Sequence, residues 1–123
     1  MNNLIIDAAN EKIFFIIMAD RKSYTTEYIN NRENFDKLTI LITKFLETHN
    51  LNIKNISNIF VNQGPGKFSA IRSSLAIVKA LSFVNKIDIY GFNSDQINNK
   101  NYVEIIELFN KGLLIKNLIK PQY

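Results

Sequence analysis

The residues that most resemble a reactive site form the stretch NQGPGKFSAIRSSLAIVKAL, residues 62–81, in which a glycine-rich loop precedes an apolar segment. Loops of this kind cradle phosphates with their backbone N–H groups. Here no serine or threonine follows Lys67, the first glycine of the phosphate-binding pattern is missing, and Pro65 removes one N–H donor. No third glycine completes a dinucleotide-binding pattern either. We therefore expect Gly64, Pro65 and Gly66 to form a tight strand-to-helix turn, with phosphate binding as the minor alternative.

Asp7 closes the first apolar stretch, a position from which a carboxylate can hold a metal ion. Nuclease chemistry with two metal ions needs several converging carboxylates, but the fourth apolar stretch ends in Asn62 and Gln63, which are neutral. A nucleotide-binding hairpin would need glycine where this chain has Ala8 and Ala9. A capping or hairpin role is therefore expected for Asp7.

His49 is the single histidine, and the chain has no cysteine. A metal site or a catalytic dyad needs a second group, such as a carboxylate pair or a thiolate, beside the imidazole. The position of His49 at the end of a predicted helix suits a cation instead. None of the serines lies in a Gly-x-Ser-x-Gly motif. No catalytic residue, metal ion or cofactor is predicted.

The composition is that of one globular domain, with 123 residues, of which 46% are hydrophobic and 21% are charged. A net charge of +4 can mark nucleic-acid binding. The basic residues are scattered, however, and AT-rich codons for Asn, Ile and Lys raise the charge by themselves. The longest apolar run, residues 13–19, is too short to span a bilayer, and the N-terminus lacks signal-peptide features. We expect a cytoplasmic protein without membrane contact.

Hydrophobic periodicity predicts the elements that must position these residues. Strands are expected at residues 4–9, 12–19, 23–30, 56–63 and 87–92, and helices at 31–49, 69–85 and 102–110. Short turns make the first three strands an antiparallel meander. The order β-β-β-α-β-α-β-α predicts an α/β fold with a mixed sheet between helices. This is the order of a ribonuclease H-like lobe, the unit that is doubled in the actin-like ATPase group.

The two long predicted helices differ in their surfaces. The helix at 31–49 has one apolar face, and Ile40 lies opposite that face as an exposed apolar residue. The helix at 69–85 is apolar nearly all round, with charge confined to Arg72 and Lys79, one heptad apart. Such a helix is covered on more than one side. The sheet is expected on one side, and either the first helix or a partner chain on the other.

The loop and second helix carry a motif that can be compared with a known family. Their sequence resembles the signature G-P-G-S-F-T-G-L-R-I-G-L-x-x-A-K-G-L of the TsaB family, also called YeaZ, and Asp7 matches the aspartate of the family's I-D-T-S strand. The family is a subunit of the bacterial machinery that makes threonylcarbamoyladenosine in tRNA. The resemblance covers about residues 4 to 94. Matched positions are Gly64, Pro65, Gly66, Phe68, Arg72, Leu75, Lys79 and Leu81, with Ser69 and Ile71 as conservative replacements.

The chain also departs from the family pattern. IDAA replaces the strand signature, and Lys67, Ala70 and Ser74 replace residues that are usually Ser, Gly and Gly. The family has a second lobe about as large again, which has no counterpart here, whereas KPQY resembles its C-terminal P-x-Y tail. Our hypothesis is that the second lobe was deleted and the closing helix kept. We thus assign residues 1–95 to the lobe and 96–123 to a linker, helix and tail, of which 102–119 pack back on it.

The resemblance implies a non-catalytic subunit that dimerises with TsaD, the threonylcarbamoyl-transferring subunit of similar fold, through the first two helices. TsaD carries a metal-binding histidine pair, which a single His49 cannot supply. Contact with tRNA would be indirect, a TsaE-like ATPase could join a larger complex, and the same helices could pair two copies of the chain. The predicted partner interface comprises Ile40, Lys44, Glu47, Arg72, Ser73, Ala76, Lys79, Ala80 and Phe83.

Two other functions stay open at the level of sequence. A degenerate ribonuclease H-like nuclease would depend on Asp7, and neutral Asn62 and Gln63 argue against it. A small RNA-binding module would use the basic residues directly, and its binding would weaken steeply with salt.

Overall fold

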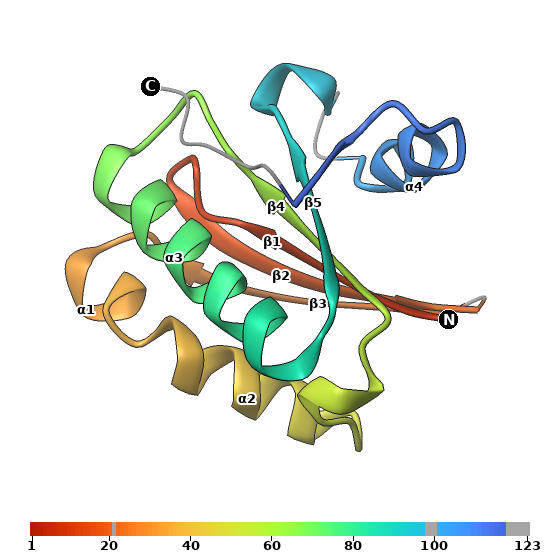
Figure 1. The fold of residues 1–123 in the computed structure, drawn as a ribbon. Coiled ribbons are helices and arrows are strands. Elements are labelled where there is room, and N and C mark those ends of the chain that lie inside the picture. The colour runs from red at the N-terminus through yellow and green to blue at the C-terminus, as the bar shows by residue number, and fades with distance from the viewer. Residues whose placement is uncertain (21, 98–100, 118–123) are drawn as a thin grey trace.

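The centre of the molecule is one six-stranded mixed sheet, seen in the computed structural model, which describes residues 1–20, 22–97 and 101–117 (Figure 1). The strand order is β3-β2-β1-β4-β5-β6. Strands β1, β2 and β3 form an antiparallel meander, β4 and β5 run parallel to β1, and β6 is antiparallel to β5. The predicted α/β class is therefore confirmed. The strands are β1 Asn2–Asp7, β2 Lys12–Ala19, β3 Lys22–Ile29, β4 Asn58–Asn62, β5 Asp88–Phe92 and β6 Ile115–Lys116.

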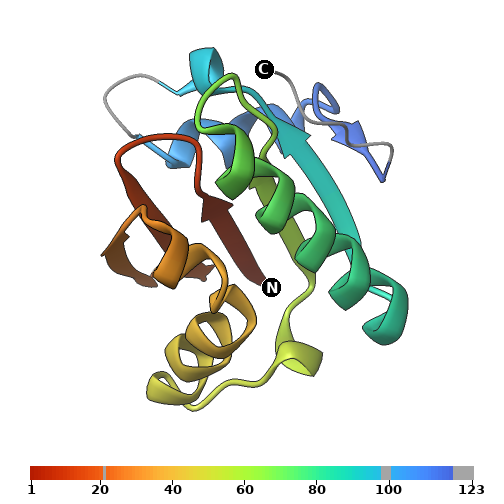
Figure 2. The same ribbon diagram turned by 90° about the vertical axis from the view of Figure 1, so that its left-hand side faces the viewer.

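Helices cover both faces of this sheet. Three of them, α1, α2 and α3, lie on one face, and α4 lies on the other (Figures 1 and 2). Two short 3-10 helices, η1 before β4 and η2 after β5, complete the connections. The helices are α1 Arg32–Phe35, α2 Leu38–Thr48, η1 Ile53–Asn55, α3 Phe68–Asn85, η2 Ser94–Gln96 and α4 Val103–Asn110.

The prediction of one continuous helix over residues 31–49 is wrong, because the chain divides into α1 and α2. The side chain of Asn31 caps α1 by accepting from the backbone N–H of Asn34 at 2.9 Å. Asn34 in turn donates through Nδ2 to the carbonyl of Ile29, at the end of β3, at 2.7 Å. The hydrogen bond from Asn34 fixes α1 to the end of β3. Lys37, with φ −110° and ψ 17°, lies outside the helical conformation and precedes the separate helix α2. The redirected α2 then buries its own apolar face.

The tail also has more structure than the sequence indicated. The periodicity predicts no strand after residue 92, but Gly91 in β5 pairs with Ile115 in β6 at the sheet edge. Before it, α4 packs its buried Ile105 against the sheet. The last residues of the predicted tail, 118–123, lie outside the described part of the chain.

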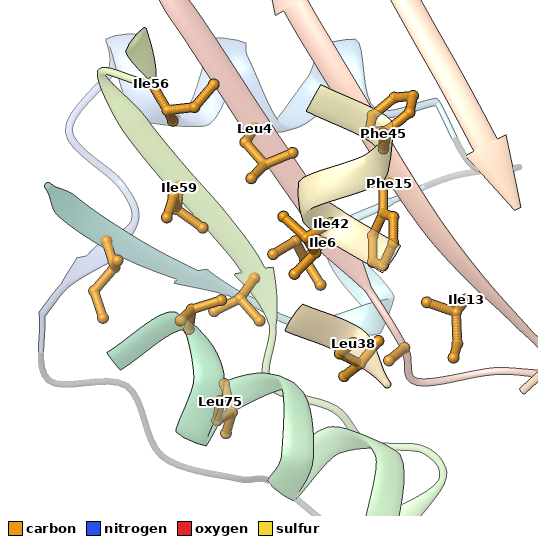
Figure 3. Close-up of a cluster of buried hydrophobic side chains, with 14 of the residues drawn as sticks. Leu4, Ile6, Ile13, Phe15, Leu38, Ile42, Phe45, Ile56, Ile59 and Leu75 are labelled. Carbon is orange, nitrogen blue, oxygen red and sulfur yellow. The ribbon is translucent and has the colours of Figure 1, made fainter. Parts of the chain in front are cut away.

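Two hydrophobic clusters follow from the alternation of side chains along the strands. The larger cluster fills the space between the sheet and helices α1 to α3 (Figure 3). The smaller cluster lies under α4, where Ile5 and Phe60 meet Tyr102 and Ile105. Because β1 is central and covered on both faces, its residues from Asn3 to Asp7 are all buried. The carboxylate of Asp7, at the end of β1, is therefore buried.

Candidate functional site

The carboxyl ends of β1 and β4 bring two polar side chains together. These strands are parallel neighbours, so Asp7 and Asn62 end at the same edge of the sheet. Asn62 donates through Nδ2 to Oδ1 of Asp7 at 3.0 Å, and the backbone N–H of Ala9 donates to the same oxygen at 3.1 Å. Only 3% of Asp7 is exposed. One carboxylate oxygen is thus held by the hairpin that follows β1 and by the adjacent strand.

The second oxygen of Asp7 is held by Tyr102, the residue that precedes α4. The Tyr102 hydroxyl donates to Oδ2 of Asp7 at 2.7 Å, and the ring is buried in the smaller cluster. Burial raises the pKa of Tyr102 well above its ordinary value of 10, and the negative charge and hydrogen bond of Asp7 raise this pKa further. Both oxygens of Asp7 therefore have protein donors. This arrangement joins three elements of the fold.

A second layer of hydrogen bonds fixes the loop that follows β4. Asn62 accepts through Oδ1 from the backbone N–H of Gly64 at 2.8 Å. From the segment after β5, Ser94 donates its hydroxyl to the carbonyl of Pro65 at 2.9 Å and its backbone N–H to the carbonyl of Gly64 at 2.9 Å. The loop is thus held from both sides by side chains and backbone at the same end of the sheet.

Both glycines of the Gly-Pro-Gly loop occupy positions that a residue with a side chain would not fit. Gly64 has a φ of 111°, a conformation that L side chains rarely adopt, and its peptide bond to Pro65 is cis. Gly66 lies so close to the first hairpin that a Cβ there would sit 2.1 Å from the carbonyl oxygen of Ala9. The next N–H, of Lys67, donates to that same oxygen at 2.8 Å. The loop packs on the β1–β2 hairpin and leads directly into α3.

His49 lies away from this network, at the end of α2. Its ring stacks on Tyr24 with centroids 4.0 Å apart and meets Phe45 edge-on at 5.2 Å. It therefore serves as packing between α2 and the sheet. Within residues 1–20, 22–97 and 101–117, no three His, Asp or Glu side chains lie together as metal ligands would. No helix in these ranges has the length and hydropathy needed to cross a bilayer.

The outer face of α3 carries exposed apolar side chains. Residues such as Ile71, Leu75 and Val78 point into the core, whereas Phe83 is 88% exposed and Val84 75% exposed. Ile40, on α2, is 55% exposed. Of the nine residues predicted for a partner interface, Ser73 is half-buried and the others are exposed.

Of the two alternatives for the second side of α3, the structure shows the first, a neighbouring helix, on one flank. Leu81 and the half-buried Ile77 pack toward the core, and Leu81 lines a groove of about 160 Å³ together with Ile42 and Leu46 of α2. Helix α2 thus lies against one flank of α3. The face that carries Ala76 and Ala80 stays exposed in this chain. The charge on α3 is positive, because Arg72 and Lys79 stand in a helix without Asp or Glu.

Sequence reasoning missed Tyr102, Ser94 and Val84. Tyr102 and Ser94 lie 95 and 32 residues from their partners Asp7 and Asn62, so no local pattern connects them. Val84 had a signal, because it follows Phe83 in the last turn of a helix that is apolar nearly all round.

The strand order and the helices on both faces of the sheet define a lobe of the ribonuclease H-like fold, which the actin-like ATPases share. YeaZ from Pseudomonas aeruginosa matches with a TM-score of 0.69 at 16% identity, over 75% of this chain and 43% of that one. RuvC from Thermus thermophilus matches with a TM-score of 0.55 at 10% identity, over 78% of this chain and 66% of that one. At such identities, these matches show the fold alone.

Sequence comparison identifies the family. The tRNA threonylcarbamoyladenosine biosynthesis protein TsaB of Buchnera aphidicola subsp. Schizaphis graminum is 28% identical over 91 residues, which are 74% of this chain and 43% of that protein. A tRNA N6-adenosine threonylcarbamoyltransferase of Geobacter metallireducens is 29% identical over 65 residues, 53% of this chain and 19% of that protein. The model of the family described as "TsaD: tRNA N6-adenosine threonylcarbamoyltransferase" matches residues 28–101. The chain belongs to this family. Its match to the TsaB protein is the longer of the two, 91 residues against 65. The chain spans less than half the length of these two relatives.

Proposed function

We propose that this chain is a non-catalytic TsaB-like subunit that dimerises with a TsaD-type subunit and so supports threonylcarbamoyladenosine modification of tRNA. The observation that carries the proposal is the exposed outer face of α3, with Phe83 88% and Val84 75% exposed beside the small residues Ala76 and Ala80. Contiguous exposed apolar surface on a soluble domain marks an interaction site. The TsaB relative named above aligns with 74% of this chain.

The contact would be made by two helices from each protein. On this chain, α3 supplies the apolar face and Arg72 and Lys79, while α2 supplies Ile40, Lys44 and Glu47. Helices that bury such faces against each other pack as a four-helix arrangement. In this proposal the tRNA is bound by other subunits, and a TsaE-like ATPase joins the same complex.

The non-catalytic role is supported by how the strand-end groups are engaged. Asp7 accepts hydrogen bonds on both oxygens, from Tyr102, Asn62 and the Ala9 backbone. His49 is held between two aromatic rings. A group that must orient a metal ion or move a proton needs an accessible lone pair within reach of substrate.

The proposal is tested by mixing the purified chain with the TsaD-type subunit of the same organism and measuring complex formation by calorimetry and light scattering. We expect a one-to-one complex that Ala76→Glu abolishes without loss of folding, because Ala76 is exposed on the contact face. Asn110→Glu adds the same charge at the exposed end of α4 and should bind normally. Unimpaired binding by Ala76→Glu would remove this surface from consideration.

Two further assays separate the rival functions. Metal-dependent cleavage of RNA that is lost in Asp7→Asn would favour a nuclease. Direct binding of tRNA by the isolated chain, weakening steeply between low and high salt, would favour an RNA-binding module.

A further inference from the structure

Strand β3 lies at one edge of the sheet and leaves one side of its backbone open (Figure 1). All eight of its residues, Lys22–Ile29, pair with β2. On the other side of β3, no segment of the described part of the chain forms a ladder with it. At the opposite edge of the sheet, β6 consists only of Ile115–Lys116. Of the two edges, β3 therefore presents by far the longer row of backbone groups.

The residues of β3 that point their backbone groups outward follow from the hydrogen bond at its end. Asn30 continues the register of β3 with β2, and its N–H donates to the carbonyl of Glu11 at 3.0 Å. Backbone groups alternate between the two sides of an antiparallel strand, so every second residue before Asn30 also bonds to β2. The residues between them point their N–H and C=O groups away from the sheet. These outward residues, all exposed, are Ser23, Thr25, Glu27 and Ile29.

The features that normally protect an edge strand are weak in β3. Natural edge strands are kept from pairing by short length, proline, bulges or charged side chains. Residues 22–29 contain no proline, and the register with β2 runs without a bulge. The charge of Glu27 is paired with Lys12 at 3.3 Å. Tyr24, Thr25 and Thr26 are residue types that favour strands. The strand is therefore suited to pairing on both sides.

The side chains of β3 that face the helices are self-complementary about Thr26. Tyr24, Thr26 and Tyr28 share this face, because side chains alternate along a strand, and both tyrosines pack against the larger cluster. In an antiparallel pair of two copies with a two-fold axis at Thr26, this residue would lie opposite its own counterpart. Tyr24 of each copy would lie opposite Tyr28 of the other. Threonine pairs and aromatic pairs across strands are both favourable.

The same register also engages the outward backbone groups of β3. It sets Ser23 opposite Ile29 of the second copy and Thr25 opposite Glu27 of the second copy. Opposite residues of this kind exchange both of their N–H···O bonds. Glu27 thus faces a threonine, and Lys22 lies beyond the last of these pairs, so no like charges stand opposite each other. One register therefore satisfies both the backbone and the side chains.

We propose that β3 is a self-pairing edge, at which two copies of this chain join their sheets through an antiparallel β3–β3 ladder centred on Thr26. One strand pair is a small interface, so the dimer is reversible and half formed at roughly 100 µM chain. Helix α3 packs on β4 and β5, away from β3 in the strand order, so its outer face stays free in the pair. The inference does not depend on the proposed function.

The first test places a cysteine at the centre of the proposed ladder. The chain has no cysteine of its own, so an introduced thiol reports the register directly. Thr26 and its counterpart would form a non-hydrogen-bonded pair with Cα atoms about 4.5 Å apart, a separation that a disulfide spans. Thr26→Cys should therefore oxidise to a covalent dimer. Lys111→Cys, at an exposed site after α4, is the control and should cross-link at least about ten-fold more slowly.

The second test removes one outward N–H from β3. Thr25→Pro loses no hydrogen bond to β2, because the N–H of Thr25 points outward, but it blocks a pairing strand. Thr25→Val keeps the N–H and is the matched control. Both are measured by sedimentation equilibrium in the Ala76→Glu background, so that the outer face of α3 does not contribute. Thr25→Pro should weaken association by at least about ten-fold relative to Thr25→Val, while circular dichroism shows both variants folded.

Three results would each overturn the inference. One is a Thr26→Cys variant that cross-links no faster than Lys111→Cys. Another is a folded Thr25→Pro variant that associates as strongly as Thr25→Val. The third is an Ala76→Glu chain that stays monomeric at about 1 mM, ten times the expected midpoint. Binding to a TsaD-type subunit enters none of these measurements, so a failure of the proposed function is distinguishable from a failure of this inference.

Discussion

The hydroxyl of Tyr102 donates a hydrogen bond to Oδ2 of Asp7 at 2.7 Å and so anchors the start of α4 to the end of β1, 95 residues away in sequence. Asp7 is 3% exposed and Tyr102 7% exposed, so water does not compete for this bond. The segment around α4 is therefore an integral layer of the described lobe, held by this bond and by the buried Ile105.

Tyr102→Phe should lower the free energy of unfolding by about 2 kcal/mol, because it leaves a buried carboxylate oxygen without its donor. Chemical denaturation followed by circular dichroism measures this directly. Tyr90→Phe is the matched control, since Tyr90 packs in the same cluster but does not bond to Asp7. Equal losses in the two variants would show that the Asp7 bond contributes no stability.

Stability should fall as the pH rises above about 10. The pKa of Tyr102 in the folded protein is raised above its ordinary value of 10, so the folded state keeps this proton when the unfolded state has released it. The contribution of Tyr102 is thus fully present below pH 10 and is lost progressively above it. Denaturation at pH 8 and at pH 11 should show a larger loss for the unsubstituted chain than for Tyr102→Phe. Parallel losses in both would contradict this assignment.

Gly66→Ala should destabilise the fold by about 1 to 3 kcal/mol, since the new Cβ would stand 2.1 Å from the carbonyl oxygen of Ala9 and force two backbone segments apart. The change would also disturb the hydrogen bond from Lys67 N–H to that oxygen. Gly112→Ala is a useful comparison. Its site is open but has a φ of +71°, so only backbone strain of about 1 kcal/mol is expected. Thermal melts of the two variants should rank Gly66→Ala as the less stable.

Phe83→Ala and Phe60→Ala should separate binding from folding. Phe83 is 88% exposed, so its removal should change stability by less than about 0.5 kcal/mol while weakening the proposed TsaD-type complex. Phe60 is fully buried, and its removal should cost about 3 to 5 kcal/mol. Melting temperatures and a binding isotherm for both variants test this. Normal complex formation by Phe83→Ala would contradict its place at the interface.

Local periodicity allowed the order of the elements and the exposed face of α3 to be predicted. A helix that is apolar nearly all round, with charge only at Arg72 and Lys79, can be recognised from consecutive residues, because its 3.6-residue repeat is a property of the segment itself. The exposure of Ile40 followed in the same way from its position opposite the apolar face. The pairing of the first three strands followed from their short turns.

Other features depended on contacts between distant segments. The break between α1 and α2 arises where Asn34 binds the end of β3, and the division of α3 into a covered flank and an open face depends on where α2 lies. The partner of Asp7 could not be predicted, because no pattern in the first strand indicates a tyrosine that arrives with α4. The sequence by itself thus determined most of the helices and strands and the apolar face that each of them would bury, because both follow from local periodicity. Only the tertiary structure decided the break at Lys37, the pairing of β6 with β5 and the tyrosine that binds Asp7, because these features depend on how distant segments pack against one another.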